Sequence, residues 1–187
     1  MPALVPPVVI AGTWGDAPQP EITLDDLLLR PWADHDVEFL RSAYRDPEIQ
    51  RWHARSMSIV EAREWVGERT LQWKNECGAD WAIAVPAGRV GRIGFRTLAL
   101  AEGRAEVAYW VAPDQRGAGF AQRALRLLTE WAFETGGLHR IELHHSTRNP
   151  ASCTVAARCG FALEGTAVSS VLHADGWHDM HVHARTC

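Results

Sequence analysis

The stretch VAPDQRGAGFAQRAL, residues 111–125, decides how this sequence folds. An apolar run ends at a proline, and Arg116, Gly117 and Gly119 then precede a segment with helical periodicity. The first turn of a helix has unpaired N–H groups and a partial positive charge, so it binds phosphate where the neighbouring side chains are small. The two glycines meet that requirement, and Arg116 adds donors shaped for phosphate oxygens. We therefore expect a diphosphate site; the alternative is a plain glycine-rich helix start.

Regular patterns flank this stretch on both sides. Residues 103–113 are typical of a β-strand that ends at Pro113, because proline removes a ladder donor. Residues 117–135 repeat apolar side chains at helical intervals. The chain has neither the G-x-x-x-x-G-K-[ST] phosphate loop nor a G-x-G-x-x-G after its first strand, which excludes the commonest nucleotide-binding folds.

The order of the remaining elements predicts an α+β (mixed α/β) fold. Helices should cover a central, mostly antiparallel mixed sheet of about six or seven strands, flanked by about four helices. The three strands between residues 80 and 113 should form an antiparallel meander. The other expected elements are a strand at 22–32, a helix from Asp34 that Pro47 interrupts, a helix at 56–75 with a Ser58–Glu61 capping box, a strand at 138–146, a short helix at 149–160 and a hairpin at 161–185 that turns at Asp175–Gly176.

The composition indicates one globular domain. The chain has 187 residues, 47% of them hydrophobic, and we expect residues 1–20 to be an extended N-terminal arm outside the core and residues 21–187 to be the domain. A formal net charge of −4 argues against nucleic acid or an anionic membrane as partner. The four separated cysteines, the lack of a signal sequence and the lack of a membrane-spanning run favour a cytoplasmic protein.

The segment EVAYWVAPDQRGAGFAQRAL, residues 106–125, resembles the acetyl-CoA-binding signature of the GNAT N-acetyltransferases. Arg116, Gly119 and Ala121 meet the family pattern R-x-x-G-x-A. STRNPASCTVAARCGFALEGT and HADGWHDMHVHAR are similar to the C-terminal segments of the RimJ/RimL-like branch, whose best-known members acetylate N-termini of ribosomal proteins.

This resemblance implies a GNAT fold in which the strand ending near Val111 splays in a V shape from the strand around residues 141–146. The pantetheine arm of acetyl-CoA then enters the gap and bonds to backbone around residues 110–112. The residues that we expect to bind the cofactor are Trp110, Val111, Arg116, Gly117, Ala118, Gly119, Phe120, Ala121, Asn149 and Ser152.

Acetyl transfer needs a neutral amine, a stabilised oxyanion and a proton for the leaving thiolate. We expect Glu106 to be the base, because it shares a strand face with Ala108 and Trp110 and apolar neighbours raise the proton affinity of a carboxylate. The alternative is a charge paired with an arginine at position 92, 96 or 104. A backbone N–H near Trp110 or Val111 is the natural oxyanion donor.

The NPAS segment matches the family's N-x-x-S motif. The resemblance places Ser152 close to the cofactor sulfur, where it aids thiolate departure, and places Asn149 on the pantetheine arm. Helix capping by Asn149 is the alternative. One position departs from the branch: where some RimL-like enzymes have a glutamate as the proposed base, this chain has Val171, which puts their mechanism and substrate in doubt here.

Histidines and tryptophans give weaker signals. His53, His173 and His178 are alternative bases near the acceptor, and Trp52 and Trp177 are the expected walls of the substrate pocket.

Two further kinds of site are set aside. We expect no metal at His144–His145 or His181-x-His183, because adjacent histidines on a strand face opposite sides and no acidic or cysteine partner has a suitable spacing. An acyl-cysteine route through Cys153 or Cys159 is disfavoured, since neither has a local histidine partner and the family reacts by direct transfer.

The sequence thus predicts an acetyl-CoA-dependent N-acetyltransferase in which a primary amine attacks the thioester directly. The acceptor is a peptide or protein N-terminus or a small-molecule amine. A non-catalytic acyl-CoA sensor or scaffold is the alternative, and a homodimer is left open.

Overall fold

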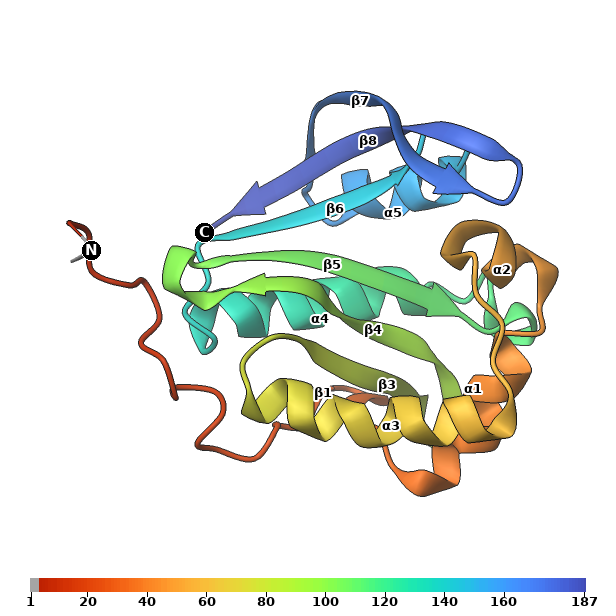
Figure 1. Cartoon of the computed structure of the whole chain (residues 1–187), viewed down its shortest axis with the longest axis horizontal. Coiled ribbons are helices and arrows are strands. Elements are labelled where there is room, and N and C mark those ends of the chain that lie inside the picture. Colours follow the sequence, from red (N-terminus) through yellow and green to blue (C-terminus); the bar gives the residue numbers. More distant parts are fainter. Residues whose placement is uncertain (1–3) are drawn as a thin grey trace.

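The structure is a computed structural model that describes residues 4–187, as an eight-stranded sheet with five α-helices (Figure 1). The strands lie in the order β1-β2-β3-β4-β5-β6-β8-β7. The strands are β1 (Ile22–Leu24), β2 (Leu27–Pro31), β3 (Ala79–Val85), β4 (Gly88–Ala99), β5 (Arg104–Val111), β6 (Arg140–Ser146), β7 (Ala162–His173) and β8 (Gly176–Thr186). The helices are α1 (Val37–Ala43), α2 (Pro47–His53), α3 (Ile59–Lys74), α4 (Phe120–Glu134) and α5 (Pro150–Arg158).

The predicted α+β class and the mostly antiparallel mixed sheet are confirmed. The meander β3-β4-β5 and the hairpin β7-β8 are antiparallel as expected, and the Ser58–Glu61 capping box begins α3. The sheet has one strand more than expected. Residues 22–32, expected as a single strand, turn at Asp25, whose φ is 53°, and form β1 and β2. One extra helix arises because Pro47 begins α2 instead of merely ending α1: the Asp46 carboxylate accepts the Ile49 N–H at 2.9 Å and caps the new helix.

The splay between β5 and β6 is confirmed. These two strands are parallel and pair at only three positions, the last being Glu106 with Glu142. Beyond that pair β5 and β6 diverge toward α2, as Figure 1 shows. The edge of β5 that faces β6 is therefore not used in a ladder at residues 107–111, so backbone groups there have no strand partner.

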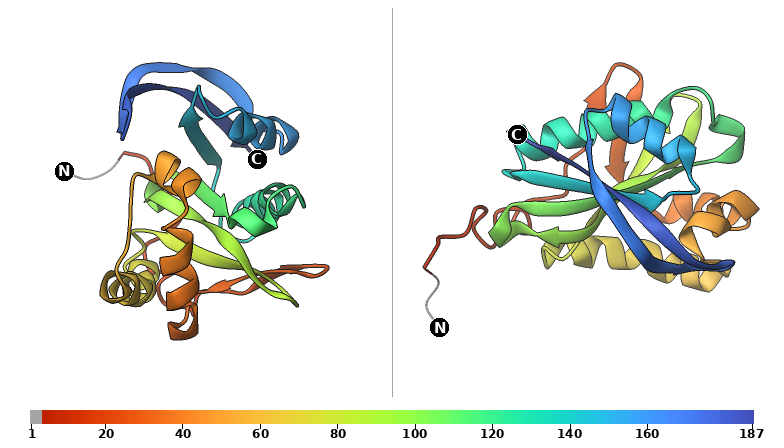
Figure 2. Two further views of the ribbon diagram at one scale, coloured as in Figure 1. Left: turned by 90° about the vertical axis from the view of Figure 1, so that its right-hand side faces the viewer. Right: turned by 90° about the horizontal axis from the view of Figure 1, so that it is seen from above.

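Helices cover both faces of the sheet (Figure 2). On one face α4 buries Leu125 and Leu128 against the strands, in a core that includes Phe95 and Val107. On the other face α1 and α3 form a second core that includes Trp110. Alternate residues of β5 thus contribute to different cores, which fixes the orientation of the strand that borders the splay.

The N-terminal segment corrects one expectation. Val9 and Trp14 are 6% and 4% exposed and belong to the larger core. The expectation that residues 1–20 lie outside the core is therefore wrong for these two residues. The Trp14 ring stacks on Trp73 at 5.2 Å, and its Nε1 donates to the Gly136 carbonyl at 3.0 Å. The part of this expectation that concerns residues 1–3 lies outside the described residues.

Candidate active site

A cavity of about 450 Å³ follows the splay from the α4 entrance to the start of α5. Nine of the ten residues expected to bind the cofactor line it, and Ala118 alone does not. Its lining comprises Glu48, Ile49, Trp52, His53, Tyr109, Trp110, Val111, Gln115, Arg116, Gly117, Gly119, Phe120, Ala121, Gln122, Asn149, Ala151, Ser152, Val155 and Arg158.

The α4 entrance has the geometry expected of a phosphate-binding helix start. Gly117 and Gly119 have φ angles of 82° and 78°, a region that favours glycine, and a Cβ on either would meet no atom within 4 Å. Helix α4 begins at Phe120 and no side chain caps its first turn. Its N-terminal N–H groups are therefore free of side-chain acceptors beside the cavity, where the helix dipole favours an anion.

Two arginines border the same cavity. Arg116 Nη2 donates to the Asp46 carboxylate at 2.9 Å and Nε donates to the Val111 carbonyl at 3.2 Å, so the loop is tied to the cap of α2. Arg158, at the end of α5, was missed by the sequence reasoning. A lone arginine at a helix end gives no local signal, since only the packing of α5 beside α4 brings it to this wall.

A second cavity of about 100 Å³ adjoins the first. Both cavities share Trp52, His53, Tyr109, Asn149 and Ser152, so these side chains mark where they meet. The rest of the smaller lining is Arg96, Val107, Ala108, Leu143, His144, His145, Ser146, Val171, His173 and Met180.

Tyr109 and Ser152 form a polar pair at this junction. Their hydroxyl oxygens lie 3.0 Å apart. Burial raises the pKa of Tyr109 to about 12, so its hydroxyl stays protonated at neutral pH and can donate to Ser152. Asn149 also borders the junction, and its Oδ1 accepts the Ser152 N–H at 3.1 Å as a helix cap. Sequence reasoning missed Tyr109, because an aromatic on a strand gives no sign of facing a serine 43 residues away.

Glu106 lies behind the smaller cavity instead of in its wall. Its carboxylate is 16% exposed and lies 3.5 Å from Arg96 Nη1 and 3.6 Å from His144 Nδ1. Pairing with Arg96 was one of the alternatives considered from the sequence. His144 and Arg96 line the smaller cavity and Glu106 does not, so its role as base stays a prediction.

The three alternative bases have different surroundings. Burial, followed by the charge of Arg92, lowers the pKa of His53 to about 3, although a hydrogen bond to the Tyr109 backbone opposes this; the ring is neutral and a weak base. His178 is buried between Ser146 Oγ and Asp175 Oδ1, 2.8 Å from each, and lines neither cavity.

Of these three histidines, only His173 combines access to the smaller cavity with a ring nitrogen that has no partner among the described residues. It is 8% exposed and lines the smaller cavity, and its Nδ1 donates to the Arg51 carbonyl at 3.0 Å. Its buried Nε2 has no hydrogen-bond partner within the described part of the chain. Val171, where the branch can have a glutamate, lines the same cavity two residues earlier on β7.

The two tryptophans expected in the substrate pocket separate in the structure. Trp52 lines both cavities, and its ring lies edge-on to His173 with centroids 6.2 Å apart. Trp177 is 60% exposed and lines neither cavity.

Comparison with known proteins identifies the family. A family profile described as "Acetyltransferase (GNAT) domain" matches residues 26–162. The chain belongs to the GNAT acetyltransferase family. As a GNAT acetyltransferase it takes its acetyl group from acetyl-CoA. The alternative of a non-catalytic sensor is therefore set aside.

This GNAT enzyme is similar to two named bacterial N-acetyltransferases. It is 29% identical over 150 residues to the uncharacterized N-acetyltransferase YoaA of Bacillus subtilis, covering 78% of this chain and 85% of that protein. It is 31% identical over 96 residues to the ribosomal-protein-serine acetyltransferase of Escherichia coli, covering 51% and 54%.

Solved structures share the GNAT fold. RimL, described as a ribosomal L7/L12 alpha-N-protein acetyltransferase in complex with coenzyme A, superimposes with a TM-score of 0.84 at 22% identity, covering 89% of this chain and 98% of that one. The microcin C7 self-immunity acetyltransferase MccE, in complex with acetyl-CoA and AMP, gives 0.81 at 21% identity, covering 88% and 94%. Among residues 4–187, no helix is long and apolar enough to cross a membrane.

Gly119→Val should weaken coenzyme A binding at least tenfold, because a branched side chain at this position of the cavity wall crowds the pyrophosphate and a positive φ disfavours it. Calorimetric titration with coenzyme A measures the change. Gly88→Val is the matched control, since Gly88 also has a positive φ and an open Cβ position but begins β4, away from the cavity. Equal loss of affinity in both variants would refute the assignment of the α4 entrance.

The depressed pKa of His53 predicts a loss of stability in acid. Between pH 6.5 and 3 the unfolded chain binds a proton at His53 that the folded chain excludes, so the contribution is fully present above pH 6.5 and falls as the pH drops. The slope reaches at most about 1.4 kcal/mol per pH unit for one group. Urea unfolding from pH 7 to 4 should show a shallower decline for His53→Gln than for wild type, whereas the exposed control His139→Gln should follow wild type.

Proposed function

We propose that this GNAT enzyme acetylates the α-amino group of a peptide or protein N-terminus, by direct attack of the amine on acetyl-CoA. The observation that carries the proposal is the smaller cavity: it is narrow, it meets the cofactor cavity at Ser152 and Tyr109, and no carboxylate among the described residues lines it.

The volume of this cavity limits the acceptor. Sites for drug-sized ligands usually occupy about 300–1,000 Å³. A space of about 100 Å³ holds one small residue with its amino group, while the rest of a peptide extends outside. This argues for a thin acceptor with a small first residue and against a bulky antibiotic-like amine.

The charge of the lining also favours an α-amino group. Arg96 and several histidines border the cavity, so an entering ammonium loses hydration and finds no carboxylate there to stabilise its charge. An α-amino group has a pKa of about 7.7–8.0 and a lysine side chain about 10.4. The α-amine therefore supplies far more neutral nucleophile at pH 7 than a lysine does.

The residues at the junction suit the remaining steps. The amine nitrogen bonds to the acetyl carbon, and a backbone N–H near Val111 on the unpaired edge of β5 stabilises the oxyanion. The C–S bond then breaks, and the leaving thiolate accepts a hydrogen bond from Ser152, whose hydroxyl Tyr109 holds in place, before it takes a proton from solvent. The amine proton passes to the lone pair of His173 Nε2, while Glu106 acts through His144. The name of the ribosomal-protein-serine acetyltransferase supports a peptide acceptor for this branch.

A panel of acceptors tests the substrate class. Peptides that begin with free Ser or Ala should be acetylated with a kcat/KM at least 100-fold above Nα-blocked peptides with one lysine, because about 2.5 pKa units separate the two amines. A first residue of Trp should lower kcat/KM at least tenfold, since the cavity is small. Thiol release and product mass measure transfer. Faster acetylation of a small diamine than of every peptide would reject the proposal and favour a metabolite amine.

The route of the amine proton is tested by paired variants. His173→Ala should lower kcat about 100-fold, as expected for loss of a general base. Glu106→Gln should lower kcat less than tenfold, because its carboxylate lies behind His144. The reverse ranking would assign the base to Glu106. Thermal unfolding of both variants separates a chemical defect from misfolding.

A further inference from the structure

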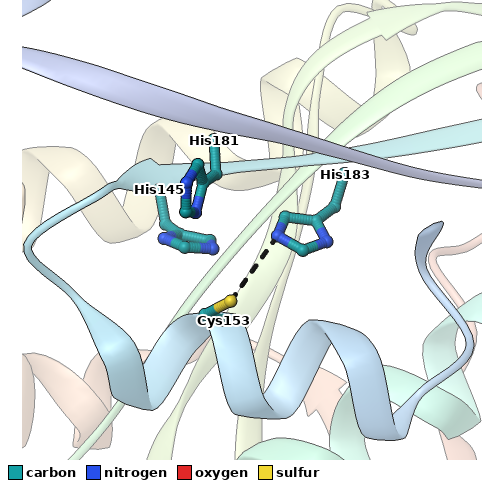
Figure 3. A group of neighbouring side chains, drawn as sticks. All are labelled: His145, Cys153, His181 and His183. Carbon is teal, nitrogen blue, oxygen red and sulfur yellow. Dashed lines mark hydrogen bonds between the residues drawn. The ribbon is translucent and has the colours of Figure 1, made fainter. Parts of the chain in front are cut away.

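Four side chains of metal-ligating type converge beside the smaller cavity, whose wall includes His145, and none of them has a role in the proposed transfer (Figure 3). His145 comes from β6, Cys153 from α5, and His181 and His183 from β8. One candidate donor atom from each lies within 4.8 Å of every other. The β6–β8 register pairs His145 directly with His181, and His183 stands two residues further on the same side of β8.

Backbone carbonyls orient two of these rings. His145 Nδ1 donates to the Ser146 carbonyl at 2.8 Å, and His183 Nδ1 donates to the Phe161 carbonyl at 3.3 Å. A carbonyl only accepts, so both rings have the proton on Nδ1 and a lone pair on Nε2. The His183 Nε2 faces Cys153 Sγ at 4.0 Å. Metal-binding histidines are commonly held by this kind of outer hydrogen bond.

Two ring nitrogens of the cluster have no partner. The Nε2 of His145 and the Nδ1 of His181 are buried and bond to nothing in the described part of the chain. The rings contact each other edge-on with centroids 5.3 Å apart, and His145 also stacks on His183 at 5.1 Å. A buried polar nitrogen without a partner is unfavourable, and a cation shared by these rings removes that cost.

We propose that His145, Cys153, His181 and His183 form a tetrahedral binding site for Zn²⁺ or a similar borderline-soft divalent cation. Three imidazoles and one thiolate are a donor set that Zn²⁺ prefers, and four protein ligands fill its coordination shell. On binding, the Cys153 thiol releases its proton to solvent and the thiolate bonds to the metal, so zinc, thiolate and three neutral imidazoles have a net charge of +1.

A closed shell of protein ligands indicates a structural site, because a catalytic zinc keeps a position open for water or substrate. The ion joins β6 and β8 to α5. Cys153 directly follows Ser152, so a metal bound at Cys153 would also fix the first turns of α5, where Ser152 and Asn149 border the junction of the two cavities. Zn–N distances of about 2.0–2.1 Å and a Zn–S distance of about 2.3 Å require the four side chains to close slightly around the ion.

Metal binding by the full-length chain tests the proposal. After chelator treatment, the wild type should retain one Zn²⁺ per chain through desalting, and Zn²⁺ should raise its melting temperature. Co²⁺ should give the visible bands of a tetrahedral ion and a thiolate-to-cobalt charge-transfer band. Cys153→Ala and His183→Ala should lower Zn²⁺ affinity at least 100-fold, and Cys153→Ala should abolish the charge-transfer band.

The exposed Cys77 provides a matched control. Cys77→Ala removes a thiol outside the cluster and should bind both metals as wild type does. Circular dichroism shows whether each variant folds. The proposal is overturned if wild type loses Zn²⁺ on desalting, if Co²⁺ binds without the thiolate band, or if folded Cys153→Ala binds Zn²⁺ as tightly as wild type.

Discussion

The parallel pairing of β5 with β6 stops after three residue pairs, and the geometry of the site depends on that stop. A ladder that continued would close the gap in which both cavities lie. The two strands are held apart because each is anchored elsewhere: β5 pairs with β4 along its length, and β6 pairs with β8. Alternate residues of β5 also enter different cores, so the strand does not rotate toward β6.

The divergence puts two helix N-termini beside the same gap. Helix α4 begins after Gly119 and borders the larger cavity, while α5 begins after Asn149 and contributes Ser152 to both cavities. In the proposed function, the first helix start binds phosphate and the second lies beside the reacting thioester. The smaller cavity, proposed as the acceptor side, is built differently, from histidines of β6 and β7 together with Trp52 of α2. Each part of the site therefore comes from its own region of sequence, joined only by the sheet.

Local signals predicted much of the fold correctly. The capping box of α3, the glycines at the entrance of α4 and the meander depend on residues a few positions apart, and the structure has all three. Errors arose where distant packing overrides a local pattern. Proline and glycine near the N-terminus suggest an arm, yet Trp14 packs on Trp73 and bonds to Gly136, because a large ring gains more from burial than a loop loses. Tyr109 and Arg158 were also missed, because only packing between distant elements brings them to the cavity.

By itself, the sequence determined the class of protein, through the resemblance of residues 106–125 to the GNAT cofactor signature, in which backbone and side chain come from one short stretch. The opposite orientations of His144 and His145 also follow from strand periodicity alone, and the structure has them: His144 contacts Glu142 and His145 contacts the rings of β8. Only the tertiary structure decided that Cys153 of α5 meets three histidines, and that Glu106 lies behind the cavity wall. Such contacts join residues far apart in the chain, and their distances are set by how sheet and helices pack, which no spacing in the sequence encodes.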